Sequence, residues 1–395
     1  MTAPRTFDAV VVGGGPAGAT AATELARAGH AVLLLDRGGR IKPCGGAIPP
    51  RLIRDFAIPD ELLVARATSA RMIAPSSRQV DMPIDGGFVG MVDREAFDEY
   101  LRVRAVAAGA TRRTGSFVRM TRDPDGCTVV HIQMKDGTAD TIRTRIVIGA
   151  DGARSAVARQ SLPGSDSIPC VFAYHEIVRS PPNGAKDFDG SRCDVYYQGR
   201  LSPDFYGWVF PHGETASVGI GSARKGFRLR EAVGALRATA GLDAMETVRR
   251  EGAPIPLRPL RRWDNGRDVV LAGDAAGVVA PASGEGIYYA MEGGRLAAEA
   301  VKAFYATGDA RALRTARKRF MREHGKVFWI LGMMQWFWYS SDKRRERFVS
   351  ICRDHDVQHL TWDAYMNKRL VRARPAAHMR IFLKDMAHLM GLVSA

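Results

Sequence analysis

The chain has 395 residues, of which 46% are hydrophobic and 25% are charged. This composition is ordinary for a globular protein, and the length allows a large core with more than one lobe. The formal net charge is +15, and the stretch from Arg311 to Lys384 holds 18 Lys+Arg against 6 Asp+Glu. We therefore expect this stretch to meet an anionic partner such as a membrane surface, with a solvated helical face as the alternative.

Cysteine spacing and hydropathy narrow the class of protein further. The five cysteines are Cys44, Cys127, Cys170, Cys193 and Cys352. No pair has CxxC spacing, so we expect no metal site and no redox dithiol, and the odd count fits a reducing cytosol. A strand begins close to the first residue, so no secretory signal is expected. The longest apolar run, Val327–Tyr339, is shorter than the roughly 20 residues that a membrane-spanning helix needs.

The first predicted element is a strand over Phe7–Val12, followed at once by the glycine turn Gly13–Gly18. An alanine-rich helix over 19–28 comes next, and a second strand over 31–35 ends at Asp36. The order of strand, glycine turn, helix, strand and acid is typical of the βαβ unit that binds a dinucleotide. We therefore predict a Rossmann-type domain at this end of the chain.

Each residue type in this unit has a physical reason. Gly13 permits the tight turn, Gly15 lets a pyrophosphate approach the backbone, and Gly18 lets the helix pack closely on the strand. The helix N-terminus offers free N–H groups to phosphates. Asp36 can accept from ribose hydroxyls and disfavours a 2′-phosphate, so NADP is not expected here, while NAD and FAD stay open. The cofactor-binding residues predicted in this unit are Gly13, Gly15, Pro16, Ala17, Gly18, Asp36 and Arg37.

The next informative stretch, Lys42–Gly46, places a cysteine before two glycines. A thiol with an ordinary pKa is protonated at neutral pH and can relay a proton. Equally, the glycines beside Cys44 allow a close approach of the chain to a flavin, and both interpretations stay open. Cys44, Gly45 and Gly46 are the candidate catalytic residues. No Ser/His/Asp triad is recognisable, and His212 is the only histidine adjacent to a proposed site.

The middle of the chain changes to strand patterns that alternate or run apolar. They cover 172–178, 193–198, 207–211 and 216–221, and they predict an antiparallel sheet. Tyr206, Trp208 and Phe210 alternate and so share one face, a flat aromatic surface that suits a long apolar chain, with core packing as the alternative. With Pro211 they are the predicted substrate-binding residues. The Gly-x-Gly at Gly219 opens no βαβ unit, so no second nucleotide-binding fold is expected.

Two further strands end in glycine and aspartate. Val147–Ser155 contains Gly-Ala-Asp-Gly, and Val269–Gly277 contains Gly-Asp-Ala-Ala-Gly and is followed by Pro281–Ile287. Both resemble the second and third flavin motifs of the hydroxylase-type FAD family that includes p-hydroxybenzoate hydroxylase. The resemblance implies FAD, with Asp274 on the ribityl chain and a helix starting near Gly286 aimed at the N1–C2=O region of the flavin. The implied cofactor contacts are Arg94, from the family's Arg-x-x-Phe-Asp helix, and Cys44, Asp151, Gly152, Asp274, Gly284, Gly286 and Ile287.

The last stretch is aromatic and basic. A dense band of aromatic, Leu and Met residues over 328–339 is followed by Lys343, Arg344, Arg345 and Arg347. Apolar aromatic segments flanked by cations fit an anchor at an anionic lipid interface. A buried helix is the alternative, because apolar residues occur all around the helical projection.

A narrower resemblance covers essentially the whole chain. Lys42–Gly46 and Tyr206–Pro211 resemble the two signatures of the geranylgeranyl reductase family, and the chain is most similar to its chlorophyll and bacteriochlorophyll branch. This implies an FAD-dependent reductase that saturates three C=C bonds of the pigment's geranylgeranyl tail to give phytyl. NADPH or reduced ferredoxin would be the transient donor. The alternatives are a prenyl reductase acting on free geranylgeranyl diphosphate or lipid, an FAD-dependent aromatic monooxygenase, and a non-enzymatic assembly protein that carries FAD.

The resulting expectation for the fold is mixed α/β and α+β. The FAD-binding Rossmann-like domain covers 1–161 and 263–310, the antiparallel substrate lobe covers 162–262, and a helical C-terminal region covers 311–395. The implied location is the cytoplasmic side of the photosynthetic membrane, as a peripheral protein without a transmembrane helix. The implied partner is a hydrophobic pigment, with other pigment-biosynthesis proteins as further candidates, and no nucleic acid is expected.

Overall fold

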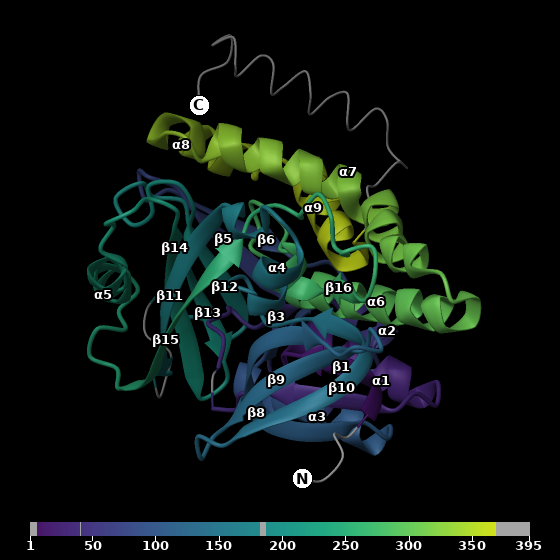
Figure 1. Cartoon of the computed structure of the whole chain (residues 1–395). Helices are drawn as coiled ribbons and strands as arrows, with labels where there is room; N and C mark the ends of the chain where they lie inside the picture. Colours follow the sequence, from purple (N-terminus) through teal and green to yellow (C-terminus); the bar gives the residue numbers. More distant parts are fainter. Residues whose placement is uncertain (1–5, 40, 182–186, 369–395) are drawn as a thin grey trace. The chain divides into compact units, whose positions relative to one another are not determined.

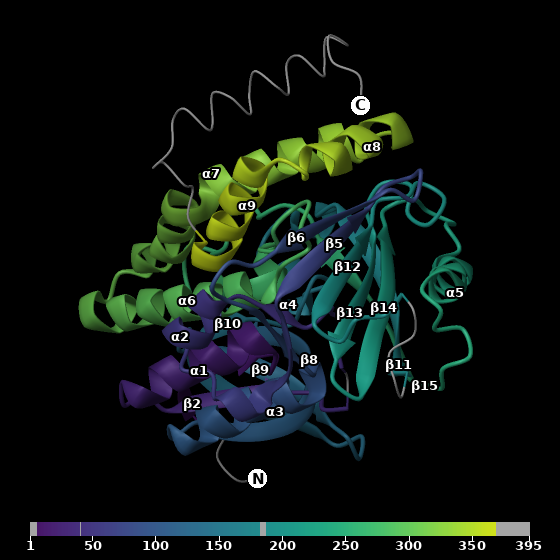
Figure 2. The ribbon, with the colours of Figure 1, turned by 180° about the vertical axis from the view of Figure 1, so that it is seen from behind.

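The computed structural model describes residues 6–39, 41–181 and 187–368. The chain forms two compact units, each built from three segments. Unit 1 contains 1–41, 95–170 and 254–329, and unit 2 contains 42–94, 171–253 and 330–395. The chain passes between the two units more often than it would between the three expected domains. The expected domain boundaries therefore stay a prediction. Figure 1 and Figure 2 label most of the helices and strands of both units.

Unit 1 is built on a sheet with the strand order β1-β2-β8-β9-β10-β16, in which β1 also pairs with β10. Its strands are β1 (Thr6–Val12), β2 (Val32–Asp36), β8 (Thr111–Arg122), β9 (Thr128–Met134), β10 (Ala139–Gly149) and β16 (Val269–Leu271). Strands β8, β2, β1, β10 and β16 pair in parallel, and β9 pairs antiparallel to β8 and β10. The continuous apolar runs of β1 and β2 are almost fully buried, as expected for parallel strands covered on both faces.

The helices of this unit follow its strands. They are α1 (Pro16–Arg27), α3 (Arg94–Ala107), α4 (Ala156–Ser161) and α6 (Ile287–Thr307), with a 3₁₀ turn η3 at Gly273–Ala276, η2 at Ser165–Ser167 and η4 at Ala310–Arg314. The predicted βαβ unit is therefore confirmed as β1-α1-β2. The predicted helix start near Gly286 is also confirmed, because α6 begins at the next residue.

Unit 2 contains a larger sheet with the strand order β15-β11-β14-β13-β12-β5-β6 and a small sheet with the order β3-β7-β4. The larger sheet contains β5 (Ser69–Ile73), β6 (Gln79–Pro83), β11 (Cys170–Arg179), β12 (Arg192–Tyr196), β13 (Gly207–His212), β14 (Thr215–Ser222) and β15 (Thr247–Pro256), and the small one contains β3 (Ala47–Ile48), β4 (Leu63–Ala67) and β7 (Val89–Val92). The four strands predicted here all form, and β11-β14-β13-β12 pair antiparallel as expected. The Gly-x-Gly at Gly219 lies within β14.

The two faces of the larger sheet carry different side chains. Val233 and Leu236 of α5 (Leu229–Thr239) pack in one cluster with Val209 and Ile220. Figure 2 shows α5 beside β14 and β11. Since side chains alternate along a strand, Tyr206, Trp208 and Phe210 lie on the face opposite to Val209. These three aromatic side chains therefore occupy the face of the sheet that α5 does not cover.

The C-terminal region is helical, with α7 (Thr315–Trp338), α8 (Asp342–Ile351) and α9 (His355–Asn367), while α2 (Pro50–Asp55) and η1 (Asp60–Leu62) lie earlier in the chain. In α7, Trp329 and Trp336 are 69% and 75% exposed, whereas Phe328 is 4% exposed and Trp338 9%. The aromatic band is therefore neither wholly buried nor wholly interfacial. The predicted helical region extends to 395, and its last part, 369–395, lies outside the described residues. In the part of the chain that the structure describes, no helix has the length and hydropathy to span a membrane.

One member of the predicted cationic cluster is not on the surface. Arg345 is 2% exposed, and its guanidinium donates to Asp342 Oδ1 at 2.7 Å, to the Pro203 carbonyl at 2.5 Å and to the Tyr339 carbonyl at 2.6 Å. A buried cation needs such partners to offset its desolvation. Arg345 therefore anchors α8 within unit 2, and its assignment to a lipid-facing cluster is wrong.

Candidate functional site

The strand register of unit 1 brings the three flavin motifs to one edge of the sheet. Val12 pairs with both Leu35 and Gly149, and Gly149 pairs with Leu271. Because these strands are parallel, their carboxyl ends lie together, and the residues that follow each end share the same edge. The glycine turn, Asp36, the Gly-Ala-Asp-Gly motif and η3 therefore assemble there.

Direct contacts confirm that the first and second motifs meet. Gly13 has φ +106°, a conformation that favours glycine, and a Cβ added to it would lie 2.6 Å from the Ala150 carbonyl carbon and 2.9 Å from the Asp151 nitrogen. Gly13 also donates its N–H to the Leu35 carbonyl at 2.8 Å. The glycine at this position is needed both for the turn and for the close approach of the two motifs.

The first motif also contacts the third. A Cβ at Gly273, which has φ +62°, would lie 2.7 Å from the Ala17 Cβ. A Cβ at Gly294 of α6 would overlap the Ala17 backbone, with the Ala17 Cα only 3.1 Å away. Helices α1 and α6 are therefore packed almost backbone to backbone at this point, and the predicted contact residue Ala17 of α1 lies against both η3 and α6.

The start of α1 fits a pyrophosphate. A Cβ added to Gly15 would meet no atom within 4 Å, so this side of the turn is open. Gly15 is the N-cap and supplies no capping side chain, and Pro16 follows at the first helical position. The free N–H groups and the positive end of the helix dipole suit an anion. These features are what the fingerprint requires of a dinucleotide site.

The acidic residue of the fingerprint has a defined geometry. Asp36 accepts from the Gly14 N–H at 2.7 Å through Oδ2 and from the Gly38 N–H at 2.7 Å through Oδ1. Each carboxylate oxygen keeps a second lone pair, so a ribose hydroxyl can still donate to it. Arg37, the next residue, is exposed. The ribose contact of Asp36 and the cofactor contact of Arg37 stay predictions.

The second motif has a structural role that sequence reasoning missed. The Asp151 carboxylate accepts from the Ser155 hydroxyl at 2.5 Å and from the Ala156 N–H at 2.7 Å, and it thereby holds the first turn of α4. Burial raises the pKa of Asp151, against the effect of these hydrogen bonds. Whether Asp151 and the neighbouring Gly152 also contact the cofactor stays a prediction.

The third motif continues from β16 into α6. Asp274 lies in η3, and Gly284 donates its N–H to the Ala280 carbonyl at 3.0 Å. Gly286 is the N-cap of α6 without a capping side chain, and Ile287 is its buried first residue. In the first turn the Tyr288 N–H donates to Glu285 Oε1 at 3.3 Å. The positive end of a helix dipole can stabilise the negative charge that collects on a flavin's N1–C2=O region on reduction. The donor set of unit 1 therefore fits FAD. Arg94 is 7% exposed at the start of α3, and its cofactor contact stays a prediction.

In unit 2, the two signature stretches contact each other. A Cβ at Gly45 would lie 2.6 Å from the Phe210 ring, and a Cβ at Gly46 would lie 2.7 Å from Nε2 of His212. The Cys44 thiol accepts from the Gly46 N–H at 3.4 Å. Side chains at either glycine would push the loop away from β13. The glycines thus hold the cysteine against the aromatic strand.

His212 continues the aromatic alternation of β13. Its Nε2 lies 3.1 Å from the Gly45 carbonyl, and since a carbonyl only accepts, Nε2 carries the proton. Burial lowers the His212 pKa to about 4, so the ring is neutral at pH 7. The neutral imidazole therefore positions the Cys44–Gly46 loop.

The aromatic face is shared, as predicted, but it is not flat. The Tyr206 and Trp208 rings are 6.2 Å apart and inclined at 66°, and Tyr206 stacks on Phe205 at 4.3 Å. Burial raises the Tyr206 pKa, with smaller contributions from Tyr339 and Cys44. The inclined rings form a wall with a polar edge.

A buried polar network behind this wall was missed by the sequence analysis. The Trp208 indole N–H donates to Ser217 Oγ at 3.0 Å, and Ser217 Oγ lies 3.0 Å from His175 Nδ1. The other ring nitrogen of His175 bonds to Glu251, and Arg249 lies 2.7 Å from the same carboxylate. His175 and Trp208 both pair with Gly219, a register that no local pattern indicates. The network fixes the Trp208 indole plane.

Unit 1 also contains a group of possible metal ligands that the cysteine and histidine spacing did not reveal. Ligand atoms of Glu292, Glu323 and His324 lie within 4.8 Å of one another. Arg295 already donates to both oxygens of Glu292, at 2.9 and 2.6 Å. This guanidinium occupies the carboxylate that a metal cation would need, so the group does not fit a metal site.

Comparisons with known proteins agree with this geometry. A family model described as "FAD binding domain" matches residues 6–169. The chain is 60% identical over 387 residues to a geranylgeranyl diphosphate reductase of Rhodobacter capsulatus, with 98% of each chain covered. It is 36% identical to a chloroplastic geranylgeranyl diphosphate reductase of Oryza sativa, covering 98% of this chain and 86% of the relative.

A solved structure has the same fold. The geranylgeranyl bacteriochlorophyll reductase-like protein of Thermoplasma acidophilum superposes with a TM-score of 0.82 at 22% identity, covering 95% of this chain and 100% of that one. The fold and the assembled flavin motifs define an FAD-binding oxidoreductase. More narrowly, the chain belongs to the geranylgeranyl reductase family, as its 60% identity over nearly the whole length shows.

Proposed function

We propose that the protein saturates the three C=C bonds of a geranylgeranyl tail carried by chlorophyll or bacteriochlorophyll, giving the phytyl tail. The observation that carries the proposal is the contact of the two reductase signatures in unit 2, where Gly45 lies against Phe210 and His212 donates to the Gly45 carbonyl. An apolar wall beside a thiol-bearing loop suits an isolated alkene better than a polar substrate.

Reduction of each double bond adds one hydride and one proton. FAD, when bound at the unit 1 motifs in its reduced form, supplies the hydride. The residues of unit 2 hold the chain and exclude water: Tyr206 and Trp208 provide the apolar wall, and the Ser217 hydrogen bond fixes the indole. The Cys44 thiol is our candidate for delivering the proton to the alkene carbon, directly or through water. NADPH or reduced ferredoxin would restore the electrons.

The proposal includes a position at a lipid surface, since a pigment with a long prenyl tail partitions into membranes. Arg322, Lys326, Trp329, Met333 and Trp336 are all exposed and recur at intervals of three or four residues along α7. They therefore form one stripe of the helix, which we call the α7 stripe. Cations next to exposed indoles favour an anionic lipid interface. The photosynthetic membrane, on its cytoplasmic side, is the surface we propose.

A second substrate is favoured by the relatives' names. The relatives of Rhodobacter capsulatus and Oryza sativa are both named as reductases of geranylgeranyl diphosphate. The free diphosphate is therefore the alternative to the pigment-linked tail, and only a side-by-side assay separates the two.

The decisive experiment uses the FAD-loaded full chain, reduced by dithionite without oxygen. Geranylgeranylated bacteriochlorophyll and geranylgeranyl diphosphate are supplied in parallel, and mass spectrometry counts the added hydrogen pairs. We expect dihydro, tetrahydro and hexahydro tails, formed faster on the pigment. Absence of all three on both substrates, with FAD bound, would contradict the function. Oxygenated products from an aerobic aromatic substrate would instead indicate a monooxygenase.

The role of Cys44 is tested in the same assay. Cys44→Ala removes the proton donor but leaves the adjacent glycines, whereas Cys44→Ser keeps a hydroxyl in place of the thiol. A proton-delivery role predicts a rate loss of about 100-fold for Cys44→Ala, within the usual range for general acid catalysis, and a changed pH–rate profile for Cys44→Ser. Wild-type rates in both variants would leave Cys44 with a packing role alone.

A further inference from the structure

The proposed reaction adds one proton and one hydride to an isolated C=C bond. Transfer of the Cys44 proton to one alkene carbon breaks the S–H bond and the π bond and forms a C–H bond. It leaves a thiolate on Cys44 and a positive charge on the other alkene carbon, to which the hydride of the reduced flavin then bonds. A positive charge beside an apolar wall is costly unless nearby groups stabilise it. The reaction therefore calls for an electron-rich group beside the chain.

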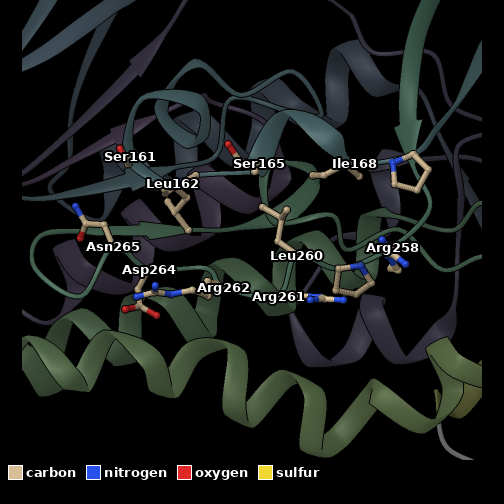
Figure 3. Close-up of a pocket in the computed structure, with 14 residues that line it drawn as sticks. Ser161, Leu162, Ser165, Ile168, Arg258, Leu260, Arg261, Arg262, Asp264 and Asn265 are labelled. Atoms are coloured by element: carbon tan, nitrogen blue, oxygen red, sulfur yellow. The ribbon is translucent and has the colours of Figure 1, made fainter.

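The cavity of unit 1 has the wrong charge for this purpose. It encloses about 550 Å³ and is lined by Arg258, Arg261 and Arg262, which Figure 3 labels and which are all exposed. The acid in its lining, Asp264, already accepts from the Gly266 N–H at 2.9 Å. A cavity lined by these cations repels a positive charge. The stabilising groups are therefore to be sought in unit 2.

The indole of Trp208 lies across the neighbouring strand β14 in unit 2. Trp208 pairs with Gly219, and a Cβ added to this glycine would lie 2.5 Å from Cε2 of the indole. The glycine thus leaves room for one face of the ring on the backbone of β14, and the other face is directed away from the strand. The face of an indole carries a negative potential that attracts cations. Trp208 is 4% exposed, so water screens this attraction little.

The indole N–H begins a chain of hydrogen bonds that runs in one direction. It donates to Ser217 Oγ at 3.0 Å, and Ser217 Oγ lies 3.0 Å from His175 Nδ1. Nε2 of His175 bonds to the Glu251 carboxylate. Because a carboxylate only accepts, Nε2 of the neutral ring carries the proton, and Nδ1 accepts from the Ser217 hydroxyl. Every donor then points toward Glu251. Such aligned bonds polarise one another, which leaves the indole richer in electrons.

The charge at the end of this chain is held in place by its neighbours. Arg249 Nε lies 2.7 Å from Glu251 Oε1, and Arg249 donates to Asp93 Oδ2 at 2.5 Å. Two carboxylates thus share one guanidinium, and these three groups together carry a net negative charge. Burial lowers the pKa of the nearby His212 to about 4, so at pH 7 that ring adds no opposing positive charge. The field behind the aromatic wall therefore favours a cation in front of it.

We propose that Trp208 stabilises the positive charge that develops on the prenyl chain during proton delivery, and that Glu251 strengthens this interaction through His175 and Ser217. Trp208 is then a catalytic residue, and the other three are positioning residues. The inference deepens the proposed function and rests on it. Because the neutral alkene gains little from the electron-rich face, the interaction acts on the rate of reduction rather than on substrate binding.

The first test replaces Trp208 by tryptophans that carry one to four fluorine atoms, since fluorine withdraws electron density from the ring face with little change of shape. The FAD-loaded full chain is reduced by dithionite and mixed with geranylgeranylated bacteriochlorophyll, and the single-turnover rate is measured. We expect the logarithm of the rate to fall with each fluorine, by about tenfold over the series, while the half-saturating substrate concentration changes little. The same replacements at Trp263, a buried indole of unit 1, are the control and should leave the rate unchanged.

The second test asks whether Glu251 acts through the indole. Glu251→Gln removes the charge and should slow the single turnover about tenfold. In a Trp208→Phe background, which has no indole N–H to polarise, the same change should have almost no further effect. Ser217→Thr keeps the hydroxyl and should be faster than Ser217→Ala. The control is Glu246→Gln, whose side chain is 75% exposed.

Three results would overturn the inference. These are equal rates across the fluorinated series, equal losses from Glu251→Gln in both backgrounds, and losses confined to substrate binding. The indole N–H resonance of Trp208 reports on the hydrogen-bond chain without any turnover, and it should move upfield in Glu251→Gln. If the wild-type chain forms no reduced tail from either substrate, the proposed function fails. If it forms them and fluorination has no effect, the function stands and the role of Trp208 fails.

Discussion

His212 lies on the same face of β13 as Tyr206 and Trp208, and its surroundings lower its pKa to about 4. Burial is the largest cause, and the hydrogen bond to the Gly45 carbonyl acts in the opposite direction. A histidine in the unfolded chain has a pKa near 6.5. Between these two values the unfolded chain binds more protons than the folded one.

This difference predicts a pH dependence of stability. The contribution of His212 is fully present above about pH 6.5 and is lost as the pH falls toward 4, by up to about 3 kcal/mol. His212→Gln keeps an amide donor for Gly45 but does not titrate, so the free energy of unfolding should fall less between pH 7 and 5 than in wild type. Urea unfolding at several pH values measures this. The exposed His355→Gln is the control, and an equal pH slope in the His212 variant would refute the assignment.

At the scale of elements, the contact of α1 with α6 is the tightest helix packing at the flavin edge. Gly294→Ala would place a Cβ against the Ala17 backbone and force the helices apart. We expect a loss of about 1–3 kcal/mol in stability from overpacking, and reduced retention of FAD, since Ala17 belongs to the first motif. Thermal unfolding and the bound flavin absorbance measure the two effects.

A matched glycine in another helix gives the opposite expectation. Gly234 lies exposed within α5, and a Cβ there would meet no atom within 4 Å. Gly234→Ala should therefore stabilise the protein by about 0.5–1 kcal/mol, because alanine loses less backbone entropy in a helix. If both variants changed stability alike, the contact with Ala17 would not be the cause.

Local sequence was enough to predict most of the elements near the site. Apolar runs, the glycine turn and the alternation from Tyr206 to Phe210 predicted β1-α1-β2, the start of α6 and the shared aromatic face. The bond from Trp208 through Ser217 to His175 could not be predicted in this way, because it depends on the register of three strands. The burial of Arg345 depends likewise on partners far away in the sequence, such as the Pro203 carbonyl.

At the scale of the whole molecule, the net charge of +15 and the α7 stripe predict binding to anionic lipid vesicles. Removing Trp329 and Trp336 together, as Trp329→Gln and Trp336→Gln, should weaken vesicle binding at least tenfold, because burying one large apolar side chain contributes about 1.5–3 kcal/mol. Flotation with anionic and neutral vesicles measures the change. Binding should also fall as salt screens the basic side chains.

A control variant separates this effect from non-specific adsorption of exposed hydrophobic side chains to vesicles. Phe172, on β11, is a large hydrophobic side chain that is 41% exposed outside the helical region. Phe172→Gln should leave vesicle binding unchanged. Equal binding to neutral vesicles, or equal losses in all variants, would count against a specific lipid-facing stripe.

The pairing of β16 with β10 has a consequence for how the protein is made. Val147 and Val269 are neighbours in the sheet, yet every residue of 171–253 is synthesised between them. A nascent chain on the ribosome therefore exposes two flavin motifs and an unpaired edge of β10 until the strands β11–β15 have emerged. The cofactor cannot be fully enclosed before that moment, and a chain interrupted earlier presents an open edge that invites aggregation. We therefore expect the flavin to be captured only after β16 has been synthesised.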